Sequence, residues 1–314
     1  MASLVQLQDV YAAQERIQGK VRRTPLMLAR PVRYMPVPHL YLKLENLQLT
    51  GSFKARGAVS KLTSLPPEAV ASGIITASGG NHGLGVAYAG WLSGSPATIF
   101  LPTSTPTAKI QKIQHWGAKV VVEGAVWDDA NRAALAVAKA ENLTYFHPFA
   151  DPVVIAGQGT IALEVLEDLP DVDVIVLAIG GGGLASGVAL AAKSLKPEIQ
   201  IIGVEPVGAP TLLESLRAGH LIELPEIRTA ANTLAPRRSE AINLELIRQH
   251  LDSIVLVSDD EMRAAARWLW SEMGIAAELS GSAALAAIMT GRATIDTRSR
   301  VCVLVCGAGT DGIS

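Results

Sequence analysis

The stretch Val174-Ile-Val-Leu-Ala-Ile-Gly-Gly-Gly-Gly-Leu-Ala-Ser-Gly187 carries the strongest indication of the fold. A β-branched run leads into four consecutive glycines and then an alanine-rich run, which predicts a buried strand, a loop and a helix start. The uncharged run 174–192 approaches the length of a membrane span. Its five glycines and its change of composition favour the strand, loop and helix instead.

The same alternation of short β-branched runs and longer amphipathic segments continues along the rest of the chain. It predicts parallel sheets covered by helices on both faces. With 314 residues and no obvious linker, we expect two domains that are interleaved in the sequence. The expected strands are 40–44, 73–76, 97–101, 119–122, 172–178, 199–204 and 301–305, and the expected helices are 5–17, 53–62, 82–93, 107–116, 127–141, 159–166, 184–195, 210–218, 259–273 and 281–290.

Composition excludes several classes of protein. The chain is 49% hydrophobic and 18% charged, which excludes a disordered chain, and its net charge of −2 favours neither nucleic acid nor an anionic membrane as a partner. The two cysteines, Cys302 and Cys306, lie in the extended run Val301-Cys-Val-Leu-Val-Cys306, so their Cα atoms would be about 13 Å apart, whereas a disulfide needs less than about 7 Å. With no disulfide and no signal-peptide pattern at the N-terminus, we expect a cytoplasmic location.

The glycine run Gly180–Gly183 is suited to an anion. Glycines let the backbone approach a ligand closely, and the N–H groups at a helix start supply partial positive charge, so a phosphate is the natural guest. A tight turn without a ligand is the simpler alternative. A nicotinamide enzyme is a third, because Gly180-x-Gly182-x-x-Ala185 fits the dinucleotide fingerprint and Glu205 ends the next strand.

Two other segments carry groups of chemical interest. Lys54 follows Ser52-Phe53 at an expected helix start; most lysines lie on the surface, and a nucleophilic lysine needs a desolvated or cationic setting. The run Ser78-Gly-Gly-Asn-His82 offers hydroxyl, amide and imidazole groups at another helix start. This run suits a carboxylate ligand, although a simple helix cap explains it equally well.

Read together, these segments resemble one family. Gly51-Ser-Phe-Lys54, Ser78–His82, Gly180–Gly183 and Cys306-Gly-Ala-Gly309 are similar to fold-type-II pyridoxal-phosphate enzymes of the threonine/serine dehydratase and serine racemase branch. The resemblance runs from about residue 24 to 309. It also covers His147-Pro148, Val154-Ile-Ala-Gly-Gln-Gly-Thr160 and Gly203-Val-Glu-Pro206.

The resemblance implies a fold and a division into domains. The implied fold is α/β, with two open, mostly parallel three-layer α/β/α domains of the tryptophan-synthase-β-like kind and the active site in the cleft between them. Residues 1–65 plus 149–314 would form a large cofactor-binding domain, and residues 66–148 a small domain that closes over the substrate.

The resemblance also implies a role for each matching residue toward pyridoxal 5'-phosphate. Lys54 would form an imine with the cofactor aldehyde and later move the substrate α-proton. The cofactor would be bound by Phe53, Lys54, Asn81, Gly180, Gly181, Gly182, Gly183, the Leu184 amide, Glu278 and Cys306, with Phe53 beside the ring and Cys306 facing the ring nitrogen. The substrate carboxylate would be bound by Ser78, Gly79, Asn81 and His82.

The implied activity is elimination of water and ammonia from L-threonine or L-serine, which yields 2-oxobutanoate or pyruvate. A racemase of this branch carries a serine where this chain has Gly79, so we expect a dehydratase; racemases and dehydratases of 3-hydroxyaspartate or phenylserine remain alternatives. Outside enzymes, a sensor of an amino acid or nucleotide is a further alternative.

Relatives bind a divalent cation at the position of Glu205, but Thr211 replaces one of their acidic ligands, so we expect no metal. We also expect a homodimer.

Overall fold

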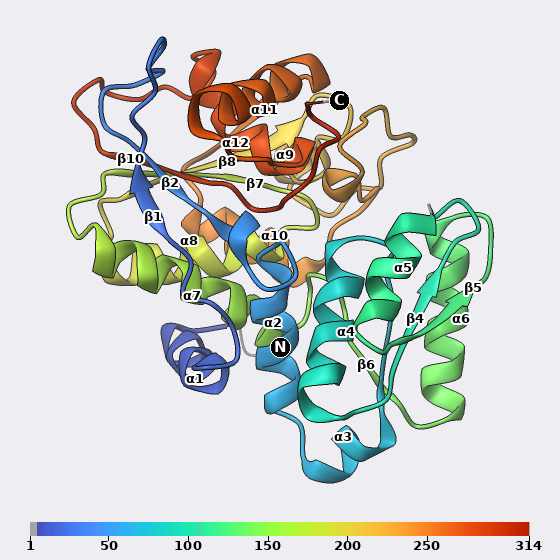
Figure 1. The fold of residues 1–314 in the computed structure, drawn as a ribbon. Helices are drawn as coiled ribbons and strands as arrows, with labels where there is room; N and C mark the ends of the chain where they lie inside the picture. The colour runs from blue at the N-terminus through green and yellow to red at the C-terminus, as the bar shows by residue number, and fades with distance from the viewer. Residues whose placement is uncertain (1–4, 106, 314) are drawn as a thin grey trace.

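Two sheets, each with helices on both faces, make up the protein (Figure 1). The computed structural model describes residues 5–105 and 107–313. The larger sheet has six strands in the order β1-β2-β10-β7-β8-β9, all parallel except β1. These strands are β1 (Leu26–Leu28), β2 (Leu40–Lys43), β7 (Val174–Ala178), β8 (Gln200–Pro206), β9 (Ser253–Val257) and β10 (Val301–Leu304).

The smaller sheet has four parallel strands in the order β5-β4-β3-β6 and comes from one internal stretch of the chain. Alternate residues of its strands face two different hydrophobic clusters: Ile74 and Ile99 face α4 and α5, whereas Ile75 and Phe100 face α6. The strands are β3 (Ile74–Ala77), β4 (Ala97–Leu101), β5 (Lys119–Val122) and β6 (Thr144–Tyr145).

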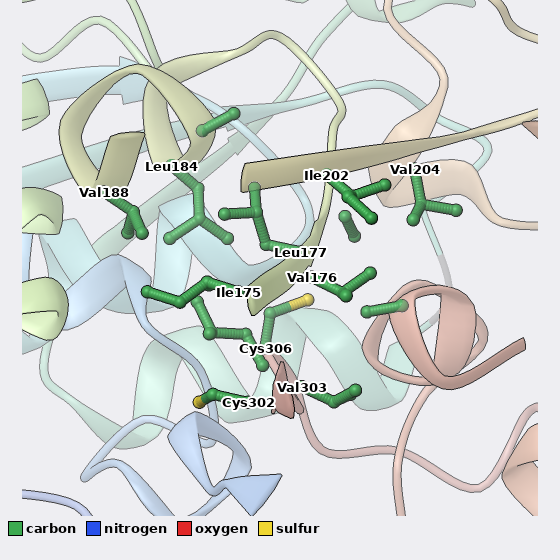
Figure 2. Close-up of a cluster of buried hydrophobic side chains, with 14 of the residues drawn as sticks. Ile175, Val176, Leu177, Leu184, Val188, Ile202, Val204, Cys302, Val303 and Cys306 are labelled. Carbon is green, nitrogen blue, oxygen red and sulfur yellow. The ribbon is translucent and has the colours of Figure 1, made fainter. Parts of the chain in front are cut away.

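Helices cover both faces of the larger sheet as well (Figure 1). In Figure 2, Ile175 of β7 lies toward Leu184 and Val188 of α8, whereas Val176 lies on the other side of the sheet. The helices are α1 (Leu7–Ile17), α2 (Lys54–Thr63), α3 (Pro67–Ser72), α4 (Asn81–Ser93), α5 (Thr107–His115), α6 (Trp127–Ala140), α7 (Pro152–Asp168), α8 (Gly183–Leu195), α9 (Thr211–Ala218), α10 (Ala241–His250), α11 (Asp259–Met273) and α12 (Leu279–Met289), and two short 3₁₀ helices cover Glu45–Leu47 and Asn232–Leu234.

The expected fold class is confirmed: the protein is α/β with mostly parallel sheets in two layered units. The uncharged run 174–192 forms β7, the glycine loop and most of α8, and none of the described helices is long and apolar enough to cross a membrane. Both cysteines are buried and free. Residues 1–4 and Ser314, at the ends of the expected large domain, lie outside the described residues.

Several expected elements needed correction. The strands β1, β6 and β9 and the helices α3 and α10 were not expected from the pattern. Helix α7 begins at Pro152 and not at Gly159, because Pro152 occupies its first turn and the Asp151 carboxylate accepts hydrogen bonds from the N–H groups of Val153 and Val154.

Helix α2 joins the two units, since it packs against both α4 and α7. Its Arg56 is fully buried and makes two hydrogen bonds to each of two carboxylates, Glu45 and Glu164. The ammonium of Lys43, also fully buried, bonds to Glu164 as well, 2.5 Å away. We call Lys43, Glu45, Arg56 and Glu164 the buried charge cluster; its charges balance, as burial of ions requires.

Candidate active site

Lys54 is the first residue of α2, and its neighbourhood contacts the segments that follow β10 of the larger sheet and β6 of the smaller sheet. The preceding segment is tied to the end of β10: the Phe53 N–H donates to the Cys306 carbonyl at 3.2 Å, and Ser52 forms an antiparallel bridge with Gly307. The Lys54 ammonium donates to the Pro148 carbonyl at 2.6 Å and lies 5.1 Å from the centre of the Phe53 ring.

The environment of this amine favours its neutral form. Burial lowers the pKa of Lys54 to about 8, against the smaller opposing effects of Cys306 and Glu278. A lysine with its ordinary pKa of 10.5 is almost entirely protonated at neutral pH, whereas at a pKa of about 8 roughly one amine in ten is neutral at pH 7. Lys54 is therefore a candidate nucleophile and proton carrier.

The glycine loop after β7 is shaped by its neighbours. A Cβ on Gly181 would lie 2.2 Å from the Phe149 ring, and one on Gly183 would lie 2.6 Å from the Phe149 carbonyl oxygen. Gly182, with φ +96°, caps α8 in the left-handed region. One glycine would have been enough for a bare turn, so the run reflects close packing against the segment that also contacts Lys54.

The N-terminus of α8 is free to bind an anion. The first amides of a helix have no partner within the helix, and no side chain in the described ranges caps this one. The Leu184 amide belongs to this first turn. Oriented N–H groups and the positive end of the helix dipole together suit a phosphate.

A second free helix N-terminus belongs to α4, at the expected substrate loop. Among the described residues, no side chain caps α4, and the Ser78 hydroxyl accepts a 3.3 Å hydrogen bond from the Gly80 N–H. His82 is buried and its Nε2 pairs with the Phe146 carbonyl at 3.0 Å; burial and the Lys54 charge lower its pKa to about 3, so the ring is neutral. The Nε2 of His82 is therefore engaged, its Nδ1 has no partner among the described residues, and the free amides are the groups of this turn best suited to a carboxylate.

Asn81 and Cys306 meet at the start of α12. The Glu278 Oε1 accepts hydrogen bonds from Asn81 Nδ2 at 2.7 Å and from Ser280 Oγ at 2.5 Å, and Cys306 Sγ donates to the Ser280 carbonyl at 3.4 Å. Burial raises the pKa of both Glu278 and Cys306. A Cβ on Gly307 would lie 2.2 Å from Glu278 Oε1, so this glycine is required for the arrangement.

The Glu205 carboxylate caps the N-terminus of α9. Its two carboxylate oxygens accept hydrogen bonds from the N–H groups of Leu212 and Leu213 at 2.8 and 2.9 Å, at the start of α9. Burial raises the pKa of Glu205 to about 8, although these amides oppose the shift. The position of Glu205 at the end of β8 is therefore explained without a ribose, because both oxygens already have partners.

The structure thus brings together most of the residues expected at the site. Phe53, Lys54, Asn81, Glu278 and Cys306 are connected by the contacts above, while the glycine loop meets the same neighbourhood through Phe149. The individual binding roles stay predictions. The sequence did not predict the roles of Phe149, Ser280 and the Pro148 carbonyl; the only local signal was His147-Pro148, which is part of the resemblance.

These groups fit pyridoxal 5'-phosphate. A phosphate needs free amides, which the α8 N-terminus has; an aldehyde needs an amine with a lowered pKa, which Lys54 has; and Cys306 is a buried neutral thiol. The fold and the site therefore define an α/β enzyme built around a reactive lysine.

Comparison with known proteins identifies the family. The family of pyridoxal-phosphate dependent enzymes matches residues 17–307, and the chain belongs to it. It is 39% identical to the L-threonine ammonia-lyase of Thermotoga maritima over 306 residues, which are 98% of this chain and 76% of that protein.

Solved structures agree with this assignment. The structure of maize serine racemase superimposes with a TM-score of 0.93 at 32% identity, covering 98% of this chain and 94% of that chain. Threonine deaminase isoform 2 from Solanum lycopersicum gives a TM-score of 0.92 at 34% identity, covering 97% and 89%. Of the classes left open by the glycine loop, the family selects the pyridoxal-phosphate enzymes over the nicotinamide enzymes.

Proposed function

We propose that this protein is a pyridoxal-phosphate-dependent ammonia-lyase that converts L-threonine or L-serine into 2-oxobutanoate or pyruvate plus ammonia. The observation that carries the proposal is the buried Lys54 amine, whose pKa is lowered to about 8 and which is bonded to the Pro148 carbonyl. Two relatives named L-threonine ammonia-lyase are 39% and 41% identical to this chain over 306 and 295 aligned residues.

The cofactor, when bound, supplies an electron-withdrawing ring that weakens the bonds to the substrate α-carbon. Around it, the protein supplies position and proton transfer. The amides at the start of α8, with the Leu184 amide, bind the phosphate through the glycine loop. Lys54 would hold the cofactor through its amine, and in its neutral form the same amine would accept the proton of the substrate α-carbon.

The start of α4 orients the substrate. Its free amides, with Ser78 and Asn81, bind the substrate carboxylate, and the hydrogen bond to Glu278 fixes Asn81 Nδ2. Cys306 presents a neutral thiol whose raised pKa keeps it protonated. A neutral thiol facing the nitrogen of the cofactor ring is a weak hydrogen-bond partner and would limit electron withdrawal by the ring. This property would favour elimination over transamination.

Gly79 favours elimination over inversion. Inversion needs a second proton donor on the substrate face opposite Lys54, and glycine offers no such group. A Cβ at this position would lie 3.0 Å from Thr105 Cγ2, so a serine would also crowd its neighbour. The serine racemase among the structural relatives is the reason to test this point directly.

We also propose the division into domains, the assembly and the location. Residues 66–148 contain the whole four-stranded sheet, which supports a small domain that closes on residues 1–65 plus 149–314. Trp270 on α11 is 54% exposed, which supports a subunit interface and hence a homodimer. The two free buried cysteines support a reducing compartment, the cytoplasm.

The test is release of 2-oxo acid from a panel of β-hydroxy amino acids: L-threonine, L-serine, 3-hydroxyaspartate and phenylserine. We expect L-threonine and L-serine to be the best substrates, the purified protein to be yellow, and Lys54→Ala to lose both colour and turnover. Lys112→Ala, an exposed lysine on α5, is the matched control and should keep both. No 2-oxo acid from any of these substrates with the yellow protein would refute the proposal.

A further inference from the structure

The turn between β6 and α7 contains His147, whose two ring nitrogens have different hydrogen-bonding roles. The Nδ1 of His147 accepts hydrogen bonds from the N–H groups of Phe149 at 3.3 Å and Ala150 at 2.9 Å. A ring nitrogen that accepts carries no proton, so the neutral ring has its proton on Nε2. Burial, together with the Lys54 charge, lowers the pKa of His147 to about 4 against the attraction of Asp151, which keeps the ring neutral.

The same turn contacts both halves of the candidate cofactor site. The carbonyl of Pro148 accepts the 2.6 Å hydrogen bond of the Lys54 ammonium, and the Phe149 ring packs on Gly181 of the glycine loop. The His147 ring packs edge-on against the Phe149 ring, with 4.7 Å between centroids. His147 thus supports the backbone on one side and the aromatic ring on the other.

We propose that His147 is a positioning residue, whose Nδ1 holds the turn that directs the Pro148 carbonyl at the Lys54 amine. The inference rests on the proposed function, in which Lys54 is the reacting amine. Without the Nδ1 acceptor, the two backbone amides lose their partner and the turn can relax away from Lys54. Lys54 then loses its hydrogen-bond acceptor.

The consequence can be measured on Lys54 itself. A carbonyl that accepts from an ammonium favours the protonated form, so its loss lowers the pKa of Lys54 further. One charge-assisted hydrogen bond corresponds to a shift of about one pKa unit. The other groups acting on Lys54, Cys306 and Glu278, and the neighbouring His82 lie on other elements and are unchanged by the substitutions.

Three variants separate the two ring nitrogens. His147→Asn keeps an acceptor oxygen at the place of Nδ1 and has no group at Nε2. His147→Gln keeps an N–H near Nε2 and has no acceptor at Nδ1, and His147→Ala has neither. His220→Ala is the control, because His220 is an exposed histidine outside the site.

The experiment uses the full-length chain after removal of the cofactor, with folding checked by circular dichroism. Modification of Lys54 by an amine-selective acylating reagent is followed by peptide mass spectrometry against pH. We expect the midpoint to fall by about one unit in His147→Ala and His147→Gln, and to stay at the parent value in His147→Asn and His220→Ala. A parental midpoint in His147→Ala, or a lowered one in His147→Asn, would overturn the inference.

A second measurement needs no variant and so decides the matter even if a variant does not fold. In ¹⁵N-labelled parent protein, the imidazole nitrogen shifts of His147 should report the Nε2–H tautomer; an Nδ1–H tautomer would overturn the inference. Neither measurement depends on turnover. Failure of the proposed function would appear as absent 2-oxo acid release and leave these results standing.

Discussion

Replacing Arg56 with methionine is the substitution that tests the architecture around Lys54 most strongly. Arg56 is fully buried and makes two hydrogen bonds to each carboxylate of the buried charge cluster, at 2.7 to 2.9 Å. Methionine has a similar length but leaves Glu45 and Glu164 facing each other in the interior. Removing one partner of a buried ion pair costs about 3–5 kcal/mol, because an uncompensated charge remains.

The assay is urea unfolding followed by circular dichroism, with the free energy of unfolding compared at pH 7. Arg23→Met is the matched control, because Arg23 pairs with Glu167 and Asp168 at the surface, where such pairs contribute about 0–1 kcal/mol. Arg56→Lys keeps the charge without the paired hydrogen bonds and should fall between the two. A loss below about 1 kcal/mol in Arg56→Met would refute the reasoning.

Acid should reduce the difference between the parent and Arg56→Met. Burial acts to raise the pKa of Glu164, but the hydrogen bonds and charges of Arg56 and Lys43 prevail and hold it below its ordinary value. A carboxyl group with a depressed folded pKa contributes stability above its unfolded pKa, about 4.3, and this contribution is lost as the pH falls through the folded pKa. A difference between the two proteins that stayed constant below pH ~4 would contradict the assigned pairing.

Three further predictions concern the site. Gly181→Ala places a methyl group 2.2 Å from the Phe149 ring, so a cofactor titration followed by the visible band should show weaker binding. Gly219→Ala is the control, because nothing lies within 4 Å of the added methyl group, and it should bind the cofactor like the parent. Equal binding by both variants would contradict the assignment of the phosphate to the glycine loop. Because the neutral amine appears as pH rises through about 8, the rate at which stripped protein regains the visible band should rise through that pH, and a midpoint near the ordinary 10.5 would contradict the lowered pKa of Lys54. With L-serine as substrate, chiral chromatography should find pyruvate without D-serine, as the glycine at position 79 predicts; inversion as fast as pyruvate formation would show that another group serves as the second base.

Long elements with a strong apolar pattern were predictable from the sequence. The β7 stretch, buried at every position, and the strands with their helices on either side follow from periodicity alone. Short elements were not: β6 consists of Thr144 and Tyr145 only, and it exists because it pairs with β3, far away in the chain. A local sequence pattern does not identify the distant strand with which a segment pairs.

The start of α7 is marked by a local signal, although the apolar pattern alone predicts a start at Gly159. Asp151-Pro152 is a helix-start signal, and the structure confirms it through the bonds from Val153 and Val154. The buried charge cluster is a different case. Lys43, Glu45 and Glu164 are residue types normally found at the surface, and only their tertiary pairing with Arg56 makes their burial possible.

The candidate site likewise contains features that could be predicted from the sequence and contacts that could not. The glycine loop and the lysine stand out in the sequence, because runs of glycine and a family-specific motif are local features. The contacts that tune them come from elsewhere in the chain: Pro148 accepts from Lys54 across 94 positions, and Asn81 donates to Glu278 across 197. These hydrogen-bond partners can be identified only in the folded structure.

The attachment point of the cofactor is the most direct test of the account. Purified yellow protein is reduced with borohydride, digested, and the peptide that carries the phosphopyridoxyl mass is sequenced by mass spectrometry. We expect the added mass on Lys54 alone, in the peptide that contains Ser52 and Phe53. The added mass on any other lysine, or a colourless protein that never gains it when supplied with pyridoxal 5'-phosphate, would contradict the central claim.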